Sequence, residues 1–255
     1  MSERGQMVMV WWGLIFMYIF GFTLWGLLHM WPTPPAYWTA AEVVSFYKEH
    51  SSDMRLGAMI SSWTSAFAMP IQIVVACQML RAERNYSGPP IWAITTLISG
   101  ALMSMFLVFP AIIWGTAAFT PDRDPNTLLA LHELGTLTFM TTDQFYIFGM
   151  VAIGLFSLFH KDPGDGTWPF PRWFGYFTLW AAIAFEPGAI AFVTKHGLFA
   201  WNGLFIFWVP VVVYSVWMSV LCYKMLRALK AQKALAQPWR DPLHTPVVRT
   251  SSAAS

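Results

Sequence analysis

Apolar residues occur in six long runs along this chain of 255 residues, and short polar segments separate the runs. Each run is close to the roughly 20 residues that an α-helix needs to cross the hydrocarbon core of a bilayer. The predicted membrane-spanning helices cover residues 7–30, 56–80, 91–119, 134–158, 173–194 and 204–226. The connections are too short to hold a soluble domain. The pattern therefore predicts an all-α, polytopic membrane helix bundle.

A polar segment between the first two runs predicts a further helix. Thr39 and Glu42 have the spacing of a capping box, in which each side chain accepts a hydrogen bond from a backbone N–H at the start of a helix. Val43 and Tyr47 then share one helical face. The segment predicts a short amphipathic helix over residues 39–50 that lies on the outer surface, either as a connector or as a lid over a pocket.

The composition supports a membrane location and narrows the classes of function. Hydrophobic residues make up 56% of the chain and charged residues 11%, whereas soluble domains carry about 25% charged residues. The net charge of +2, together with the lack of a recognisable nucleic-acid-binding motif, argues against nucleic acid as a partner. Neither of the two cysteines belongs to a CxxC motif or a Cys/His cluster.

The distribution of positive charge predicts the orientation. With the N-terminus in the cytoplasm, eleven of the 15 basic residues fall on the cytoplasmic side of the six crossings. This asymmetry follows the positive-inside rule and predicts that both termini are cytoplasmic. Residues 1–230 then form a six-helix transmembrane domain, and residues 231–255 form a basic, disordered cytoplasmic tail. Short loops and the lack of a eukaryotic sorting signal favour a bacterial inner membrane.

The fourth run is the most polar of the six, and its polar residues share one face. At about 100° per residue, His132, Thr136, Asp143 and Tyr146 lie along one stripe of a continuous helix. An aspartate at the centre of a membrane helix costs about 2.5–3.5 kcal/mol. The stripe is therefore expected to face the bundle interior or a water-filled cavity.

The fifth run contains one acid, Glu186, which is followed by Pro187 and Gly188. Proline cannot donate to the carbonyl of Ile183, and it disfavours helical geometry at the residue before it. A helix break with a free backbone acceptor is expected here. Glu186 and Asp143 both lie roughly 13 Å from the outer ends of their helices, at 1.5 Å per residue. The two carboxyls are candidates for acid/base catalysis or proton binding.

Polar and aromatic residues near these acids are candidates for contact with a substrate. Gln72 belongs to a small, polar stripe of the second run, which Pro70 interrupts. Trp180 lies away from the membrane interface, where tryptophan is most common. The candidate substrate-binding residues are His132, Thr136, Tyr146, Gln72, Gln144 and Trp180.

Histidines toward the outer side raise the question of a metal site. The spacing of these residues matches no strong motif, because the segment HELGT lacks the second histidine of an HExxH motif. The sequence therefore predicts no metal site and identifies no cofactor. The residues that would serve as ligands if a metal were bound are His29, His132, Glu133 and His196.

Three functions remain open from the sequence. The first is binding or transport of a small lipophilic molecule, or coupling to protons, through a broken helix and buried acids. The second is an intramembrane enzyme that uses paired carboxyls on a terpenoid-, sterol- or quinone-like substrate. The third is a non-catalytic subunit of a larger, oxidase-type membrane complex. The expected partners are the lipid bilayer, a lipophilic molecule, and either further copies of the chain or another membrane subunit.

Overall fold

All the regular secondary structure in the described residues is helical. The structure, a computed structural model, describes residues 2–83 and 88–236. Its elements are α1 (Glu3–Gly26), α2 (Ala40–Thr64), η1 (Ser65–Phe67), α3 (Ala68–Glu83), α4 (Ile91–Phe119), α5 (Pro125–Thr141), α6 (Gln144–Phe159), α7 (Arg172–Phe185), η2 (Glu186–Phe192), η3 (Gly197–Phe199), η4 (Leu204–Trp208) and α8 (Val209–Ala236). Of these, η1, η2 and η3 are 3-10 helices and η4 is a π-helical turn. The predicted all-α class is confirmed for this part of the chain.

Five helical stretches are long and apolar enough to cross a membrane. They are Glu3–Gly26, Ala40–Glu83, Ile91–Phe119, Pro125–Phe159 and Gly197–Leu235, and each overlaps one of the predicted runs. The predicted run 173–194 differs, because α7 has 14 residues and passes directly into the seven-residue η2. The chain therefore has the character of a multi-pass helical membrane protein, and the sixth crossing remains a prediction.

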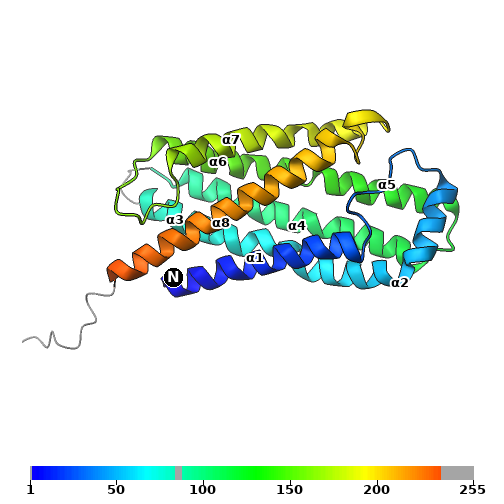
Figure 1. Cartoon of the computed structure of the whole chain (residues 1–255), viewed down its shortest axis with the longest axis horizontal. Coiled ribbons are helices and arrows are strands. Elements are labelled where there is room, and N and C mark those ends of the chain that lie inside the picture. Colours follow the sequence, from blue (N-terminus) through cyan, green and yellow to red (C-terminus); the bar gives the residue numbers. More distant parts are fainter. Residues whose placement is uncertain (1, 84–87, 237–255) are drawn as a thin grey trace, which may run out of the picture.

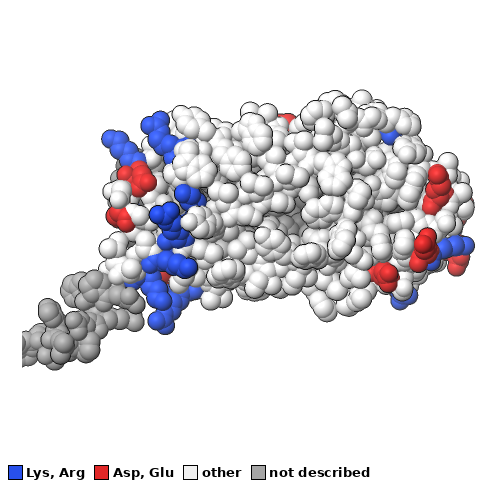
Figure 2. Space-filling view, viewed as in Figure 1, with Lys and Arg blue, Asp and Glu red and all other residues white. Residues whose placement is uncertain are grey.

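The start of α1 and the end of α8 lie at the same end of the bundle (Figure 1). Figure 2 shows that lysine and arginine side chains gather in a band at this end, while the middle of the face in view is almost uncharged. Because α8 continues to Ala236, residues 231–236 of the expected tail are helical. The remainder of that tail, 237–255, lies outside the described residues.

The segment expected to be a separate surface helix is the first part of a longer one. The Thr39 hydroxyl accepts from the Glu42 N–H at 3.4 Å, and the Glu42 carboxylate accepts from the Thr39 N–H at 2.6 Å, so the capping box is present. Val43 and Tyr47 are buried, as predicted. The end point at residue 50 is wrong, however, because α2 continues to Thr64. No proline or glycine between residues 50 and 56 ends the helix.

The long helix formed by α2 and α3 is kinked shortly before Pro70. Because proline has no N–H, the carbonyl of Ala66 loses its helical partner. The chain passes through η1 at this point, and the ψ angle of Ala66 is 17°, outside the helical range. Beyond the kink, Gln72 is fully buried and packs against Gly100 of α4, where any added side chain would overlap it. The kink thus places Gln72 in the bundle core.

Candidate functional site

The fourth membrane-spanning segment is interrupted at Thr142 and Asp143, between α5 and α6. The hydroxyls of Thr141 and Thr142 donate to the carbonyls of Leu137 and Thr138, each at 2.8 Å. They compete with backbone N–H groups for these acceptors, which weakens the helix locally. The prediction of one continuous helix in this run is therefore wrong. Asp143 precedes the first turn of α6, and its carboxyl makes no capping hydrogen bond there.

The fifth segment is interrupted at Glu186, as its Pro187 predicted. The local geometry differs from the expectation, because Glu186 keeps helical backbone angles (φ −52°, ψ −36°). Its N–H donates to the carbonyl of Ile183, three residues earlier. The chain tightens into the 3-10 helix η2, so the acceptor released by proline is occupied. The expected free carbonyl and the expected loss of helical geometry at Glu186 are therefore wrong.

The two interruptions pack against each other. A Cβ atom at Gly188 would lie 2.8 Å from the carbonyl oxygen of Met140 and 3.1 Å from both carboxyl oxygens of Asp143. The side-chain amide of Gln144 spans the joint, donating to Asp143 Oδ1 at 3.4 Å and to the carbonyl of Phe185 at 3.5 Å. The Asp143 carboxyl is thus held where two broken helices meet.

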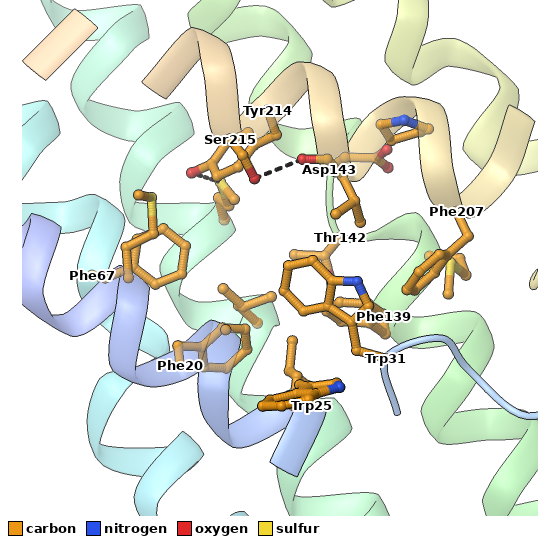
Figure 3. Close-up of a pocket in the computed structure, with 18 of the residues that line it drawn as sticks. Phe20, Trp25, Trp31, Phe67, Phe139, Thr142, Asp143, Phe207, Tyr214 and Ser215 are labelled. Atoms are coloured by element: carbon orange, nitrogen blue, oxygen red, sulfur yellow. Dashed lines mark hydrogen bonds between the residues drawn. The ribbon is translucent and has the colours of Figure 1, made fainter. Parts of the chain in front are cut away.

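A cavity of about 390 Å³ lies beside this joint, between α1, α8 and the α5–α6 interruption. Its walls are mainly apolar and rich in aromatic rings, including those of Phe20, Trp25, Trp31, Phe67, Phe207 and Tyr214 (Figure 3). Figure 3 shows Asp143 on the same side as Tyr214 of α8, with the rings of Phe20 and Trp25 across the cavity. Among the described residues that line it, Asp143 is the one acid, and there is no lysine, arginine or histidine. Apolar walls with a single polar anchor are typical of a small-molecule site.

The cavity opens sideways, toward the surface that lipid would cover. Three residues that line it on α1, Tyr18, Phe22 and Trp25, are each more than half exposed, at 54%, 67% and 64%. Ser215 of α8 is also exposed, and its hydroxyl donates to the carbonyl of Val211 at 2.8 Å. Figure 2 shows a hollow on this face, where α1 and α8 run in front in Figure 1. The cavity is therefore open on a side of the bundle that a bilayer would surround.

Glu186, the second predicted acid, does not line the cavity. It lies on the exposed surface of η2, although it is close enough to act electrostatically on Asp143. Neither carboxyl forms a salt bridge with a residue of the described chain. The two acids are neighbours that face different spaces, so they do not present two carboxyls to one bound molecule.

Two residues of the predicted polar stripe, His132 and Tyr146, are buried in the bundle away from the cavity. The Nδ1 atom of His132 lies 3.3 Å from the hydroxyl of Tyr47. The rings around His132 belong to Trp38, Phe46, Tyr47 and Trp201. The hydroxyl of Tyr146 accepts from the side-chain amide of Gln72. These residues hold helices together, and Tyr146 also contacts the ring of the lining residue Tyr214, with centroids 6.0 Å apart.

The remaining predicted contacts are also separate from the cavity. Thr136 is fully buried, and its hydroxyl has no partner among the described residues. Trp180 lies on the outer face of α7 and is 56% exposed. None of the six predicted substrate-binding residues lines the cavity, although Gln144 contacts the lining residue Asp143.

The candidate metal ligands His29, His132, Glu133 and His196 do not converge on one point, because each contacts a different partner. His29 stacks on His50, with ring centroids 4.0 Å apart, and Glu133 pairs with Lys195 at 2.5 Å. His196 stacks on Tyr37, and His132 lies beside Trp38. Within residues 2–83 and 88–236, no group of three or more histidine, cysteine or acidic side chains has the arrangement of a metal site.

The His29–His50 pair predicts a dependence of stability on pH. His29 follows the end of α1; burial, and after it the nearby His50, lower its pKa below the ordinary 6.5, while Asp53 and Glu49 oppose the shift. Because the unfolded chain then binds a proton more readily, stability is complete above the unfolded pKa and falls as the pH drops below it. The melting temperature in detergent is expected to be lower at about pH 5 than at about pH 7.5.

The substitution His29→Asn should reduce this dependence, since asparagine does not titrate and tolerates the positive φ of 54° at this position. An unchanged difference between the two pH values in the variant would show that other groups cause it.

Sequence reasoning missed most of the cavity wall, above all Phe20 and Trp25 of α1 and Tyr214 of α8. The sequence contained one indication of an aromatic site, because the first apolar run is rich in aromatic residues, but it did not show which of them face the cavity. A helix that is apolar all round does not show which face meets lipid and which meets protein.

No known protein family, curated protein or solved structure matches this chain. The class of protein is therefore defined by the fold and the cavity. Five apolar helices give a multi-pass membrane protein, and its cavity is aromatic, contains one carboxyl and opens to the side.

Proposed function

We propose that the protein binds a small lipophilic molecule that enters from the bilayer between α1 and α8. The observation that carries this proposal is the sideways opening of an aromatic cavity of about 390 Å³ with Asp143 among its lining residues. A carboxyl in such a cavity fixes the orientation of a ligand, while the apolar walls supply contact area. Transport or proton coupling would extend this function, and two interrupted helices meeting at the site are typical parts of carriers.

The proposed topology has six crossings with both termini in the cytoplasm. Together α7 and η2 run without a gap over residues 172–192, which is close to the roughly 20 residues that a crossing needs. The basic band at the end where α1 begins and α8 ends supports a cytoplasmic position for that end. The proposed location is a bacterial inner membrane.

Filling the cavity from α1 tests the proposed function. Gly21 lines the cavity, whereas a Cβ atom at Gly26 of the same helix would meet no atom within 4 Å. Native mass spectrometry of the full-length protein, purified in mild detergent, is expected to show a retained lipophilic molecule. Gly21→Leu should lose this molecule because leucine occupies part of the cavity, and Gly26→Leu should retain it. Equal retention by both variants, or no retention by the wild type, would contradict the proposal.

A second function, that of a subunit in a larger membrane complex, is favoured by the outer face of α7 and η2. Trp180 and Ile183 are 56% and 70% exposed, and Glu186 is also exposed. A carboxyl against lipid is costly, so a donor on another membrane protein would stabilise it. In the same mass spectra, a second polypeptide or a further copy of the chain would support this function.

The acid/base enzyme has less support from the structure. Such a mechanism needs a proton donor and an acceptor at the same reacting group. Here Asp143 lines the cavity and Glu186 faces outward.

A further inference from the structure

We propose that the molecule bound in this cavity carries one positive charge, as a lipophilic amine or quaternary ammonium ion does. The proposal rests on the proposed function and adds the chemical class of the ligand. Three properties of the cavity support it: a carboxyl with no basic partner, walls of aromatic rings, and an opening into lipid.

The first property is a carboxyl that has no basic partner. Asp143 has no salt-bridge partner in the described chain, and the cavity lining includes no basic residue. Glu186 lies close enough to act electrostatically on this carboxyl. A bound cation would stabilise the ionised form of the Asp143 carboxyl, and the attraction is strong where water is scarce. A bound anion would disfavour that ionised form.

The second property is the aromatic wall. A cation within about 6 Å of an aromatic ring face is attracted by the negative face of the ring, most strongly by tryptophan. Trp31, Phe207 and Tyr214 line the cavity together with Asp143, and Figure 3 shows Tyr214 on the same side as that carboxyl. The cavity therefore combines a carboxyl with ring faces, which is the chemistry that recognises alkylammonium groups.

The third property is the direction of the opening. The charged end of the ligand would lie at Asp143, and its apolar part would extend along Phe22 and Trp25 of α1 toward the lipid. An amphiphilic cation dissolved in the bilayer has this shape. The ligand would thus keep its apolar part in an apolar environment throughout binding.

The test uses three fluorescent probes that share one apolar rod: diphenylhexatriene, its trimethylammonium derivative and its propionic acid derivative. The full-length protein is placed in phosphatidylcholine nanodiscs, and energy transfer from its tryptophans reports binding, with empty nanodiscs as the background. The cation is expected to bind saturably and at least about tenfold more tightly than the neutral rod, a factor that corresponds to about 1.4 kcal/mol. The acid derivative should bind most weakly.

The substitution Asp143→Asn should weaken binding of the cation about tenfold and change binding of the neutral rod by less than about twofold. If this variant does not fold, Glu186→Gln serves instead, because its side chain is exposed; a severalfold loss specific to the cation is then expected. Equal affinities for the cation and the neutral rod would overturn the charge proposal and leave the proposed function intact. Saturable binding of none of the three probes would contradict both.

Discussion

Replacing Trp217 by alanine is expected to lower the free energy of unfolding by about 3–5 kcal/mol, the usual loss when a core tryptophan or phenylalanine is replaced by alanine. The Trp217 side chain is fully buried on α8. Its ring stacks on Phe174 of α7 with centroids 6.3 Å apart, and its Nε1 donates to Thr178 Oγ1 at 2.9 Å. Because helix association in lipid depends on packing and on hydrogen bonds between helices, the variant loses both between α7 and α8. The change in the free energy of unfolding can be measured by denaturing the wild type and the variant in mixed detergent–lipid micelles.

The matched control is Trp180→Ala on α7. Trp180 is 56% exposed, so its loss should change the free energy of unfolding by no more than about 0.5 kcal/mol. Similar losses in the two variants would mean that Trp217 is not buried between α7 and α8 as described.

The substitution Gly188→Ala is expected to destabilise the joint between the two broken helices by about 1–3 kcal/mol, the usual cost of overpacking. The added methyl group would lie 2.8 Å from the Met140 carbonyl oxygen and 3.1 Å from the Asp143 carboxyl. The backbone at Met140 has little freedom to move, so η2 must separate from α5. Since Asp143 moves with the joint, binding of the cationic probe should also weaken.

The control for this prediction is Gly26→Ala, where the added methyl group meets no atom within 4 Å. This variant should unfold at the wild-type temperature and bind the probe normally. If Gly188→Ala behaved in the same way, the close contact between η2 and the Asp143 carboxyl would not exist in the protein.

Local patterns predicted the parts of the fold that depend on neighbouring residues in the chain. The capping box at Thr39 formed because its partner is three residues away. The interruptions near Pro70 and Pro187 followed from the missing N–H of proline. The break at Thr142 was not predicted. Thr141 and Thr142 could have indicated it, because threonine hydroxyls compete with backbone N–H groups for helical carbonyls.

The candidate site was predicted only in part. Asp143 was expected to face the interior because the cost of a carboxyl in lipid depends on its own chemistry, and this residue lines the cavity. The same reasoning applied to Glu186, and yet that residue is exposed on η2. The six expected binding residues were chosen from helical stripes, and a stripe does not show which neighbouring helix covers it.

By itself, the sequence determined the all-helical membrane class, most of the helix positions and the two acids of interest. Those properties depend on the length and polarity of single segments, because each segment must itself be long and apolar enough to cross the bilayer as a helix. Only the tertiary structure decided that the interruptions at Asp143 and Gly188 meet, that Glu186 faces outward, and that α1 and α8 leave a cavity between them. The reason is physical: a cavity is a property of helix pairs, and lipid-facing and protein-facing apolar surfaces have the same composition.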